Sequence, residues 1–408
     1  MSDARRLISF KDALEEVERV GPLHIQEIET GKARGRVLAA DVLSNVDSPP
    51  RDSSLKDGYA LRFGDIARAS QKSPVTLEVV GNLAAGEDKE FSITGGQAVR
   101  IMTGARIPSG ADAVLPQEFT RQDGDEVVCL ADSGPGRNIL SKGADLSKGE
   151  VVASRGSILT PGLLGLITGA GVTRLKVYAP PKVVIVATGS ELAEEGMIDE
   201  SKKIFPSNRA TIIAWLHRFG IYADARLCAD ELKALETLFG QCLEEFDVVI
   251  TSGGVLDGER DLVVSVLESL GVNFLFKRVR MGPGKGVCMG SKGPKLVFNL
   301  PGGPPSNYVA FIFIALASVL RLMGDTRQFP ARARATLLKD VKGRPDWTQL
   351  ILARSSMKGG SLFTTPVLEE SRLKRIASSD SVIIIPEGRS HIRAGDQAEI
   401  AILDLFQY

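Results

Sequence analysis

Residues 246–261 read FDVVITSGGVLDGERD, an apolar run that leads into two glycines and then into three acidic residues. The apolar run is typical of a buried strand, and Gly253 and Gly254 leave the following loop without side chains. Because glycine has no Cβ, a ligand can approach the amide groups of such a loop closely. The stretch predicts either a tight turn with a solvated rim or a loop whose amides bind an anion beside a carboxylate that holds a metal ion.

The residues around this loop alternate between strand and helix patterns. KVVIVATGSEL (182–192) and KLVFNLPGG (295–303) are strand patterns that end in glycine, like the strand before Gly253. Gly220 is placed to end one of the intervening helices in a left-handed turn. Such alternation predicts a parallel, right-handed α/β sheet, to which we assign residues 178–327. The predicted helices cover residues 210–220, 231–246, 260–271 and the segment after Pro304.

The glycine loops are candidates for a binding site. In open parallel sheets, ligands bind beyond the carboxyl ends of the strands, where helix N-termini also converge. Since carboxylate oxygens suit a hard cation such as Mg²⁺, we expect Ser252–Gly254 to cradle a phosphate, with Glu191 and Asp261 as metal ligands. A valine at Gly253 should then block the ligand and leave the stability of the fold nearly unchanged. One such loop is more often structural, whereas three in one domain, with Gly302 and Gly303 in the third, favour a site.

Other candidates lie in turns outside these loops. Lys285 in MGPGKG could reach a phosphate, and Asp57 in SSLKDGYA and Thr103 in RIMTGA are placed where a chain turns. Each also has a structural interpretation, as a solvated lysine, a hairpin corner or a turn after a strand. The three histidines are scattered, so a histidine metal site or a Ser-His-Asp triad has little support. The sequence also lacks the glycine-lysine loop of ordinary P-loop NTPases.

The rest of the chain divides into further domains. Ser9 is a plausible cap for a helix that starts at Phe10, and we expect this helix to pack with a second helical segment at 158–176. Short β-type runs with glycine turns predict an inserted β-rich domain, and similar runs after residue 330 predict a C-terminal β module. We assign an elongated helical and linker part to residues 1–46 and 146–177, the inserted β-rich domain to 47–145 and the C-terminal domain to 328–408.

Composition places the chain in the soluble globular class. Its 408 residues are 43% hydrophobic and 25% charged, and 50 basic residues balance 50 acidic ones, so no global charge favours nucleic acid or a membrane surface. The four cysteines show no CxxC spacing, as expected for reduced core thiols. The start of the sequence shows no secretory signal, and the apolar run at 308–320 is too short for a membrane span. We expect a cytoplasmic protein with a buried helix at 308–320.

The ordered set of motifs DGYA (57–60), RIMTGA (100–105), TGSEL (188–192), SGGVLDGERD (252–261), PGKG (283–286) and LPGGP (300–304) resembles the MoeA / gephyrin E-domain family. The match covers essentially the whole chain in the same order. The resemblance implies an α/β molybdopterin-binding domain, an inserted β domain, an elongated helical part and a C-terminal β barrel. It also implies a homodimer whose cleft forms between the β domain of one protomer and the α/β domain of the other.

The resemblance further implies an activity and its residues. Members insert molybdate into adenylylated molybdopterin, use Mg²⁺ and release AMP, so that other cofactor-biosynthesis proteins and apo-molybdoenzymes are implied partners. The implied catalytic residues are Asp57, Thr103, Glu191, Asp261 and Lys285. The implied pterin-binding residues are Thr188, Gly189, Asn208, Asp230, Ser252, Gly253, Gly254, Gly284, Pro301, Gly302 and Pro304.

Several positions depart from the family pattern and keep alternatives open. Losing charged or polar groups should weaken or retune oxyanion binding, which allows a diverged paralogue that handles tungstate or a non-catalytic pterin-binding scaffold. A molybdopterin adenylyltransferase shares the α/β domain, but the extra domains argue against it. The departing residues are Lys56, Ser190, Pro206, Ser207, Leu256, Asp257, Gly282 and Gly303.

Overall fold

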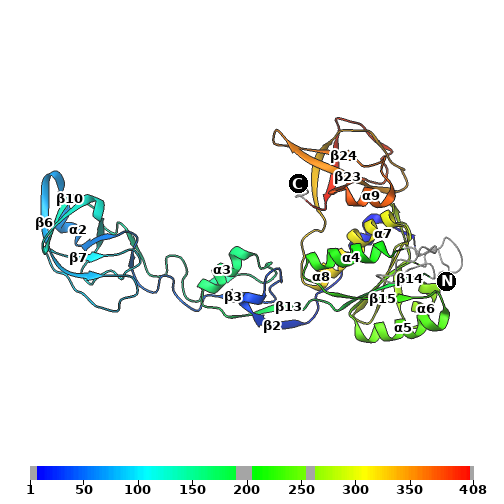
Figure 1. The fold of residues 1–408 in the computed structure, drawn as a ribbon, viewed down its shortest axis with the longest axis horizontal. Helices are drawn as coiled ribbons and strands as arrows, with labels where there is room; N and C mark the ends of the chain where they lie inside the picture. The colour runs from blue at the N-terminus through cyan, green and yellow to red at the C-terminus, as the bar shows by residue number, and fades with distance from the viewer. Residues whose placement is uncertain (1–6, 190–204, 254–261, 405–408) are drawn as a thin grey trace. The chain divides into compact units, whose positions relative to one another are not determined.

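The computed structural model describes residues 7–189, 205–253 and 262–404 (Figure 1). The chain forms two compact units. The larger unit comprises Met1–Gln26, Gly35–Ala39 and Val177–Tyr408, and the smaller unit comprises Glu27–Arg34 and Ala40–Lys176. Each unit is considered by itself below.

The larger unit contains a six-stranded sheet in the order β15-β14-β16-β20-β19-β17. The first four strands run parallel, which confirms the predicted α/β sheet. β19 runs antiparallel to both of its neighbours, β20 and β17. Only two residues join β19 to β20, and so short a loop cannot connect parallel strands. β15 and β19 were not predicted. The strands are β14 (Val183–Thr188), β15 (Ala223–Cys228), β16 (Val248–Ser252), β17 (Asn273–Phe276), β19 (Cys288–Lys292) and β20 (Lys295–Leu300).

Helices cover both faces of this sheet, as the near-continuous apolar strands require. Along β14, Val183 and Ile185 pack into one core cluster with α4 and α7, whereas Val184 and Val186 pack into another with α5 and α6. α4 ends as predicted, since Gly220 has φ +70° and donates its amide hydrogen to the His217 carbonyl. The helices are α4 (Ser207–Arg218), α5 (Leu232–Glu245), α6 (Leu262–Ser269) and α7 (Pro304–Ala310).

A long apolar helix is part of the core of the larger unit. α7 continues through η4 (Phe311–Leu316), a wider π-helical segment, into α8 (Ala317–Leu322). The combined helix of 19 residues has the length and composition of a membrane span, but 83% of its apolar window is buried inside the protein. The prediction of a buried helix at 308–320 is therefore confirmed.

The C-terminal part of the larger unit closes into a β barrel, as predicted. Five strands pair in the order β23-β24-β21-β27-β25, and β25 pairs back with β23. β18 pairs in parallel with β23 and so joins the sheet of the barrel rather than the sheet that contains β17. The elements are β18 (Arg278–Gly282), β21 (Ala331–Leu337), β22 (Val341–Lys342), β23 (Thr348–Lys358), β24 (Ser361–Pro366), α9 (Arg372–Ala377), β25 (Ser381–Ile385), β26 (His391–Ile392) and β27 (Gln397–Ile402).

The smaller unit is β-rich, as predicted. Its main sheet has six strands in the order β8-β5-β7-β6-β10-β9, with a core cluster on each face. The elements are β5 (Gly58–Leu61), α2 (Phe63–Ile66), β6 (Ser70–Leu83), β7 (Gln97–Ile101), β8 (Ala113–Pro116), η3 (Gln117–Phe119), β9 (Thr120–Asp123) and β10 (Glu126–Ala131).

The prediction that residues 1–46 and 146–177 form a helical part is wrong. Ser9 does cap α1, but Phe10, Ala13 and Val17 pack into the core of the larger unit, whereas α3 packs on β12 and η2. The remaining residues form short strand pairs between distant segments, such as β3 with β12, which local periodicity cannot reveal. The elements are β1 (Leu7–Ser9), α1 (Phe10–Glu18), β2 (Ile25–Glu29), η2 (Thr30–Lys32), β3 (Val42–Leu43), β4 (Ser53–Ser54), β11 (Ile139–Leu140), β12 (Val151–Ala153), α3 (Pro161–Gly169) and β13 (Arg174–Tyr178).

Candidate functional site

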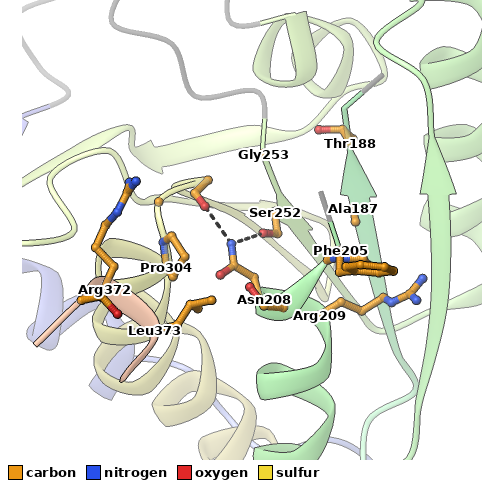
Figure 2. A pocket seen from close by; sticks show the side chains of 15 residues that line it. Ala187, Thr188, Phe205, Asn208, Arg209, Ser252, Gly253, Pro304, Arg372 and Leu373 are labelled. Carbon is orange, nitrogen blue, oxygen red and sulfur yellow. Dashed lines mark hydrogen bonds between the residues drawn. The ribbon is translucent and has the colours of Figure 1, made fainter. Parts of the chain in front are cut away.

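A cavity of about 730 Å³ lies at the carboxyl ends of β14, β16 and β20 (Figure 2). This is the edge of the sheet at which the sequence predicted a site. The wall combines residues from the strand ends, from the first turns of α4 and α7, and from the start of α9. The lining residues are Ala187, Thr188, Phe205, Pro206, Ser207, Asn208, Arg209, Ser252, Gly253, Gly302, Gly303, Pro304, Ser371, Arg372 and Leu373.

Ser252 is the centre of a hydrogen-bond network in this wall. Its hydroxyl oxygen accepts an amide hydrogen from Asn208 at 3.2 Å and another from Asn307 at 3.0 Å. Asn208 also donates to the Gly302 carbonyl at 2.9 Å, and Asn307 donates to the Pro301 carbonyl at 2.9 Å. Since a carbonyl oxygen can only accept, these two bonds fix which way each side-chain amide points.

The network determines whether the Ser252 hydroxyl can act as a hydrogen-bond donor or as an acceptor toward a ligand. A hydroxyl oxygen accepts through two lone pairs and donates one hydrogen. Both lone pairs of Ser252 are occupied by amide donors, and no described residue accepts its hydrogen. Ser252 is therefore a prepared hydrogen-bond donor, suited to an acceptor oxygen of a ligand in the cavity.

Gly253 is constrained by the fold. Its φ of +119° is rare for other residues, and a Cβ at this position would collide with the carbonyl oxygen of Thr188 on β14. The expectation that a valine here would leave stability unchanged is therefore wrong, because the side chain would meet the neighbouring strand. The Thr188 hydroxyl, on a residue only 2% exposed, has no hydrogen-bond partner among the described residues.

Gly302 and Gly303 form the third loop and line the cavity. A Cβ at Gly302 would lie 3.8 Å from the Gly253 Cα, an ordinary contact, and a Cβ at Gly303 would meet nothing within 4 Å. No contact among the described residues requires glycine at either position, so their backbone is open to a ligand on the described side of the cavity. Pro304 begins α7 beside this loop.

Some predicted residues lie outside the described part of the chain, and others lie outside the cavity lining. Glu191, Gly254 and Asp261 belong to the first group. Gly189 donates its amide hydrogen to the Cys228 carbonyl at 3.3 Å, which joins the ends of β14 and β15. Asp230 follows β15 at the same edge of the sheet, but it is not part of the lining.

Lys285 lies in a turn that packs beside α7. A Cβ at Gly284, whose φ is +109°, would approach the Ser306 carbonyl oxygen to 3.4 Å. The exposed Lys285 ammonium lies over the Trp347 ring, 5.7 Å from its centroid, and does not line the cavity. The loop that carries Lys285 therefore lies against the start of α7, but the ammonium group contacts Trp347 of the barrel.

Asp57 and Thr103 come together in the smaller unit. The Asp57 carboxylate accepts hydrogen bonds from the Thr103 backbone amide at 2.7 Å and from its hydroxyl at 2.8 Å. These two bonds hold the pKa of the Asp57 carboxyl below its ordinary value. A Cβ at Gly58 would collide with the Leu115 carbonyl oxygen, so the glycine of this Asp-Gly pair is needed for close strand packing.

The described residues do not form a metal site by themselves. No group of three or more His, Cys, Asp and Glu residues that could hold a metal is found among them. The described cavity lining contains hydroxyl and amide oxygens but no carboxylate. Mg²⁺ binding at this cavity would therefore need a carboxylate from outside the described residues, where the predicted ligands Glu191 and Asp261 lie.

Sequence reasoning missed Asn307 and the contribution of the barrel. Asn307 is only 2% exposed and lies inside a helix, where the sequence offers no loop signal. Its place four residues after the glycine pair, on the first turns of a helix, is the one feature that could have indicated its role. Arg372 and Leu373 lie far along the chain in another domain, and no local pattern connects them with the glycine loops.

The comparisons with known proteins agree with this architecture. The family model for the MoeA N-terminal region (domain I and II) matches residues 8–171, and the model for a probable molybdopterin binding domain matches residues 184–321. A molybdopterin molybdenumtransferase of Staphylococcus epidermidis is 30% identical over 409 residues, which are 98% of this chain and 97% of the relative. The corresponding protein of Staphylococcus aureus strain MRSA252 is 28% identical, with the same coverage of 98% and 97%.

A solved structure extends the similarity to the fold. The molybdopterin biosynthesis MoeA protein of Pyrococcus horikosii superimposes with a TM-score of 0.84 at 28% identity and covers 98% of this chain and 100% of its own. Both the sequence and the fold are thus shared along nearly the full length. The chain belongs to the molybdopterin molybdenumtransferase (MoeA) family.

Proposed function

We propose that this protein inserts molybdate into adenylylated molybdopterin and releases AMP, as a step in molybdenum cofactor biosynthesis. The relatives at 28–30% identity are named for this transferase activity. The single observation that carries the proposal for the cavity is the Ser252 hydroxyl, whose two lone pairs are occupied and whose hydrogen is accepted by no described residue. Such a donor suits the phosphate oxygens of a phosphorylated pterin.

The remaining parts of the cavity have matching roles in this proposal. The open backbone of Gly302 and Gly303 allows a bulky anionic ligand to approach, and Asn208 and Asn307 orient Ser252. The described lining carries arginines and no carboxylate, so an anionic ligand meets no described repulsive charge. These residues bind and orient the substrate.

The metal and the catalytic residues are also part of the proposal. We assign Mg²⁺ binding to Glu191 and Asp261, and catalytic roles to Asp57, Thr103 and Lys285, on the basis of the family motifs that these residues match. When bound, Mg²⁺ would supply charge compensation for phosphate oxygens. Molybdate is the metal-bearing substrate, with tungstate as the competing candidate.

The assay that tests the proposal follows both products. Purified full-length protein is incubated with adenylylated molybdopterin, Mg²⁺ and molybdate, and AMP release and pterin-bound molybdenum are measured. Parallel reactions receive tungstate in place of molybdate, or molybdopterin with ATP in place of the adenylylated substrate. We expect AMP and metal-loaded pterin in equal amounts with molybdate.

Other outcomes of this assay would contradict the proposal in distinct ways. Pterin binding without AMP release would identify a non-catalytic binding protein. Adenylylation of molybdopterin by ATP would identify an adenylyltransferase, and metal loading with tungstate alone would identify a tungstate-specific paralogue.

The proposal places the reaction in the cytoplasm and in a homodimer. None of the four cysteines forms a disulfide within the described residues, which is compatible with reduced thiols in that compartment. Sedimentation equilibrium of the full chain should give twice the mass of one chain. A monomer at micromolar concentration would contradict the dimer.

A further inference from the structure

The C-terminal barrel contributes a cation to the cavity of the α/β domain. Arg372, the first residue of α9, lines the cavity together with Gly302, Gly303 and Pro304 (Figure 2). α9 packs against α7, the helix that begins at Pro304, so the two domains meet at the third glycine loop. The cavity wall is thus completed by a residue that the strand-end pattern does not include.

The Arg372 guanidinium is available to a ligand. Among the described residues, no hydrogen bond or ion pair engages it, and the side chain is exposed. Arg209 also lines the cavity, but it already has an interaction partner, and its guanidinium points away from Ser252 in Figure 2. Since the described lining contains no carboxylate, Arg372 is a positive charge beside the open glycine backbone without a described counter-charge.

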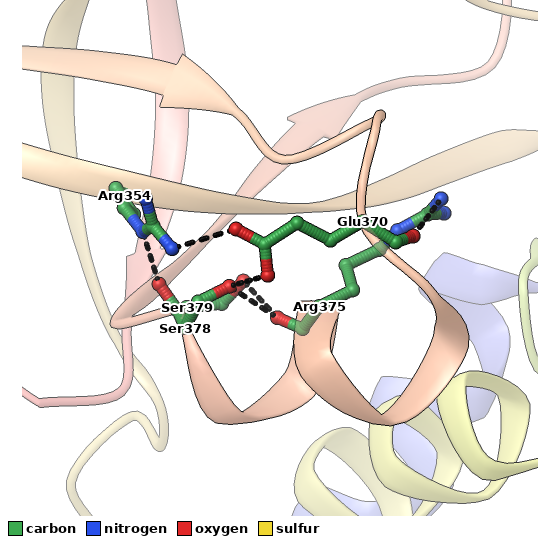
Figure 3. A network of polar contacts seen from close by, with 5 residues as sticks. All are labelled: Arg354, Glu370, Arg375, Ser378 and Ser379. Atoms are coloured by element: carbon green, nitrogen blue, oxygen red, sulfur yellow. Dashed lines mark hydrogen bonds and ion pairs between the residues drawn. The ribbon is translucent and has the colours of Figure 1, made fainter.

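Glu370 anchors the start of α9 to the barrel (Figure 3). One carboxylate oxygen accepts a hydrogen bond from Arg354 Nη2 on β23 at 2.8 Å, and the other accepts from the Ser378 hydroxyl at 2.7 Å. Arg354 Nε also donates to the Ser378 carbonyl at 2.7 Å. Glu370, two residues before α9, and Ser378, directly after it, are therefore tied to each other and to one barrel strand.

A second set of bonds joins α9 to its preceding loop. Arg375 Nη2 donates to the Leu368 carbonyl at 2.7 Å and to the Glu370 carbonyl at 3.2 Å. The Ser379 hydroxyl donates to the Arg375 carbonyl at 2.7 Å. α9 has only six residues and no fully buried side chain, so these bonds add to the packing of half-buried Ile376 against the core in holding its orientation.

We propose that Arg372 recognises a tetrahedral oxyanion of the substrate and that Glu370 is a positioning residue that holds Arg372 at the cavity. A guanidinium donates two parallel hydrogen bonds to a phosphate or a similar oxyanion, and a fixed support reduces the entropy lost on binding. The oxyanion can come from the pterin phosphate, from the adenylate or from molybdate. The identity of these ligands rests on the proposed function, whereas the charge and its placement do not.

Binding measurements on the full-length protein test the role of Arg372. Molybdopterin, AMP and sodium molybdate are titrated separately into wild type, Arg372→Gln, Arg372→Lys and Lys374→Gln. Lys374→Gln is the matched control, since it removes one exposed positive charge from the same helix but does not line the cavity. We expect Arg372→Gln to lower the affinity for at least one probe by about tenfold or more. Arg372→Lys should lower the affinity for the same probe less, and Lys374→Gln should bind every probe as wild type does.

The probe that loses affinity identifies the source of the oxyanion. Equal affinities of wild type and Arg372→Gln for all three probes would overturn the inference, as would an equal loss in Lys374→Gln. Wild-type protein that binds the probes but transfers no metal would contradict the proposed function and leave the Arg372 comparison intact. Wild-type protein that binds none of the three would overturn both.

A double-mutant cycle tests the role of Glu370. If Glu370 acts through Arg372, Glu370→Ala should weaken the same probe, and the Glu370→Ala/Arg372→Gln double variant should bind no more weakly than Arg372→Gln alone. Glu370→Gln retains the shape and one acceptor oxygen and should recover most of the affinity. Additive losses, with both variants folded by circular dichroism, would show that Glu370 does not position Arg372.

Discussion

The side-chain amide of Asn307 donates a hydrogen bond to the Ser252 hydroxyl at 3.0 Å, from a residue inside a helix to the end of a buried strand. Asn208 donates a second hydrogen bond to the same hydroxyl oxygen, so both acceptor sites of Ser252 are occupied and its own hydrogen must point elsewhere. Both asparagines are held by backbone carbonyls, so the arrangement exists before a ligand arrives. Preorganised donors of this kind bind an anion without reorganising the site.

Ser252→Ala should therefore reduce the affinity for molybdopterin by about tenfold, because one charge-assisted hydrogen bond is lost. The free energy of unfolding should fall by only about 1 kcal/mol, since Asn208 and Asn307 keep their carbonyl partners. Calorimetric titration and denaturant unfolding measure the two quantities. Ser291→Ala is the control, because Ser291 pairs with Leu296 at the opposite end of the sheet. Unchanged pterin affinity in folded Ser252→Ala would remove Ser252 from the site.

Gly302 and Gly253 should respond in opposite ways to alanine. Gly302→Ala adds a methyl group with ordinary contacts, so we expect an unchanged melting temperature and weaker pterin binding. Gly253→Ala forces a side chain into a φ of +119° and against the Thr188 carbonyl, so we expect a loss of about 1–3 kcal/mol in unfolding free energy. Thermal unfolding and titration of both variants check this contrast. A Gly253→Ala protein as stable as wild type would show that the loop can move away from β14.

The strand-end loops could be predicted because their signals are local. An apolar run followed by glycine is visible in the sequence, and parallel topology then places the loops after β14, β16 and β20 together. Asn307 could not be predicted in this way, since a buried polar residue within an apolar helix shows its role only through its partner. Arg372 depends on how the barrel packs against α7, which is a tertiary contact without a sequence pattern.

The same distinction explains the errors in the fold. The helical pattern of α1 was recognised, but its partner was not, because Phe10, Ala13 and Val17 indicate an apolar face without indicating what covers it. β3 and β12 are only two and three residues long, too short for a period-two pattern. Lys285 was placed in the correct turn, but the direction of its side chain depends on Trp347 of another domain.

Asp261→Asn should raise the Mg²⁺ concentration needed for metal transfer while leaving molybdopterin affinity nearly unchanged. Removing one carboxylate from a site of oxygen ligands lowers its affinity for a hard cation. The substitution does not alter Ser252 or the Gly302–Gly303 backbone, so pterin binding should remain. Initial rates across a Mg²⁺ series, with pterin titrations in parallel, separate the two effects. Asp224→Asn is a suitable control, since Asp224 is an exposed acid on the edge strand β15 and not part of the lining. If pterin binding is lost together with activity, Asp261 supports the fold and not the metal.

Thr103→Val should raise the pKa of Asp57 toward the ordinary aspartate value, because it removes the hydroxyl donor and leaves the backbone donor. A depressed carboxyl pKa favours the folded state above the unfolded pKa, and this contribution is lost as the pH falls through the lower folded pKa. If metal transfer needs ionised Asp57, its rate should therefore begin to fall at a higher pH in Thr103→Val than in wild type as the solution is made more acidic. NMR titration of the Asp57 carboxyl and pH–rate profiles measure the two shifts. Thr103→Ser keeps the hydroxyl and should titrate as wild type. An unchanged Asp57 pKa in Thr103→Val would mean that the backbone amide alone sets the ionisation.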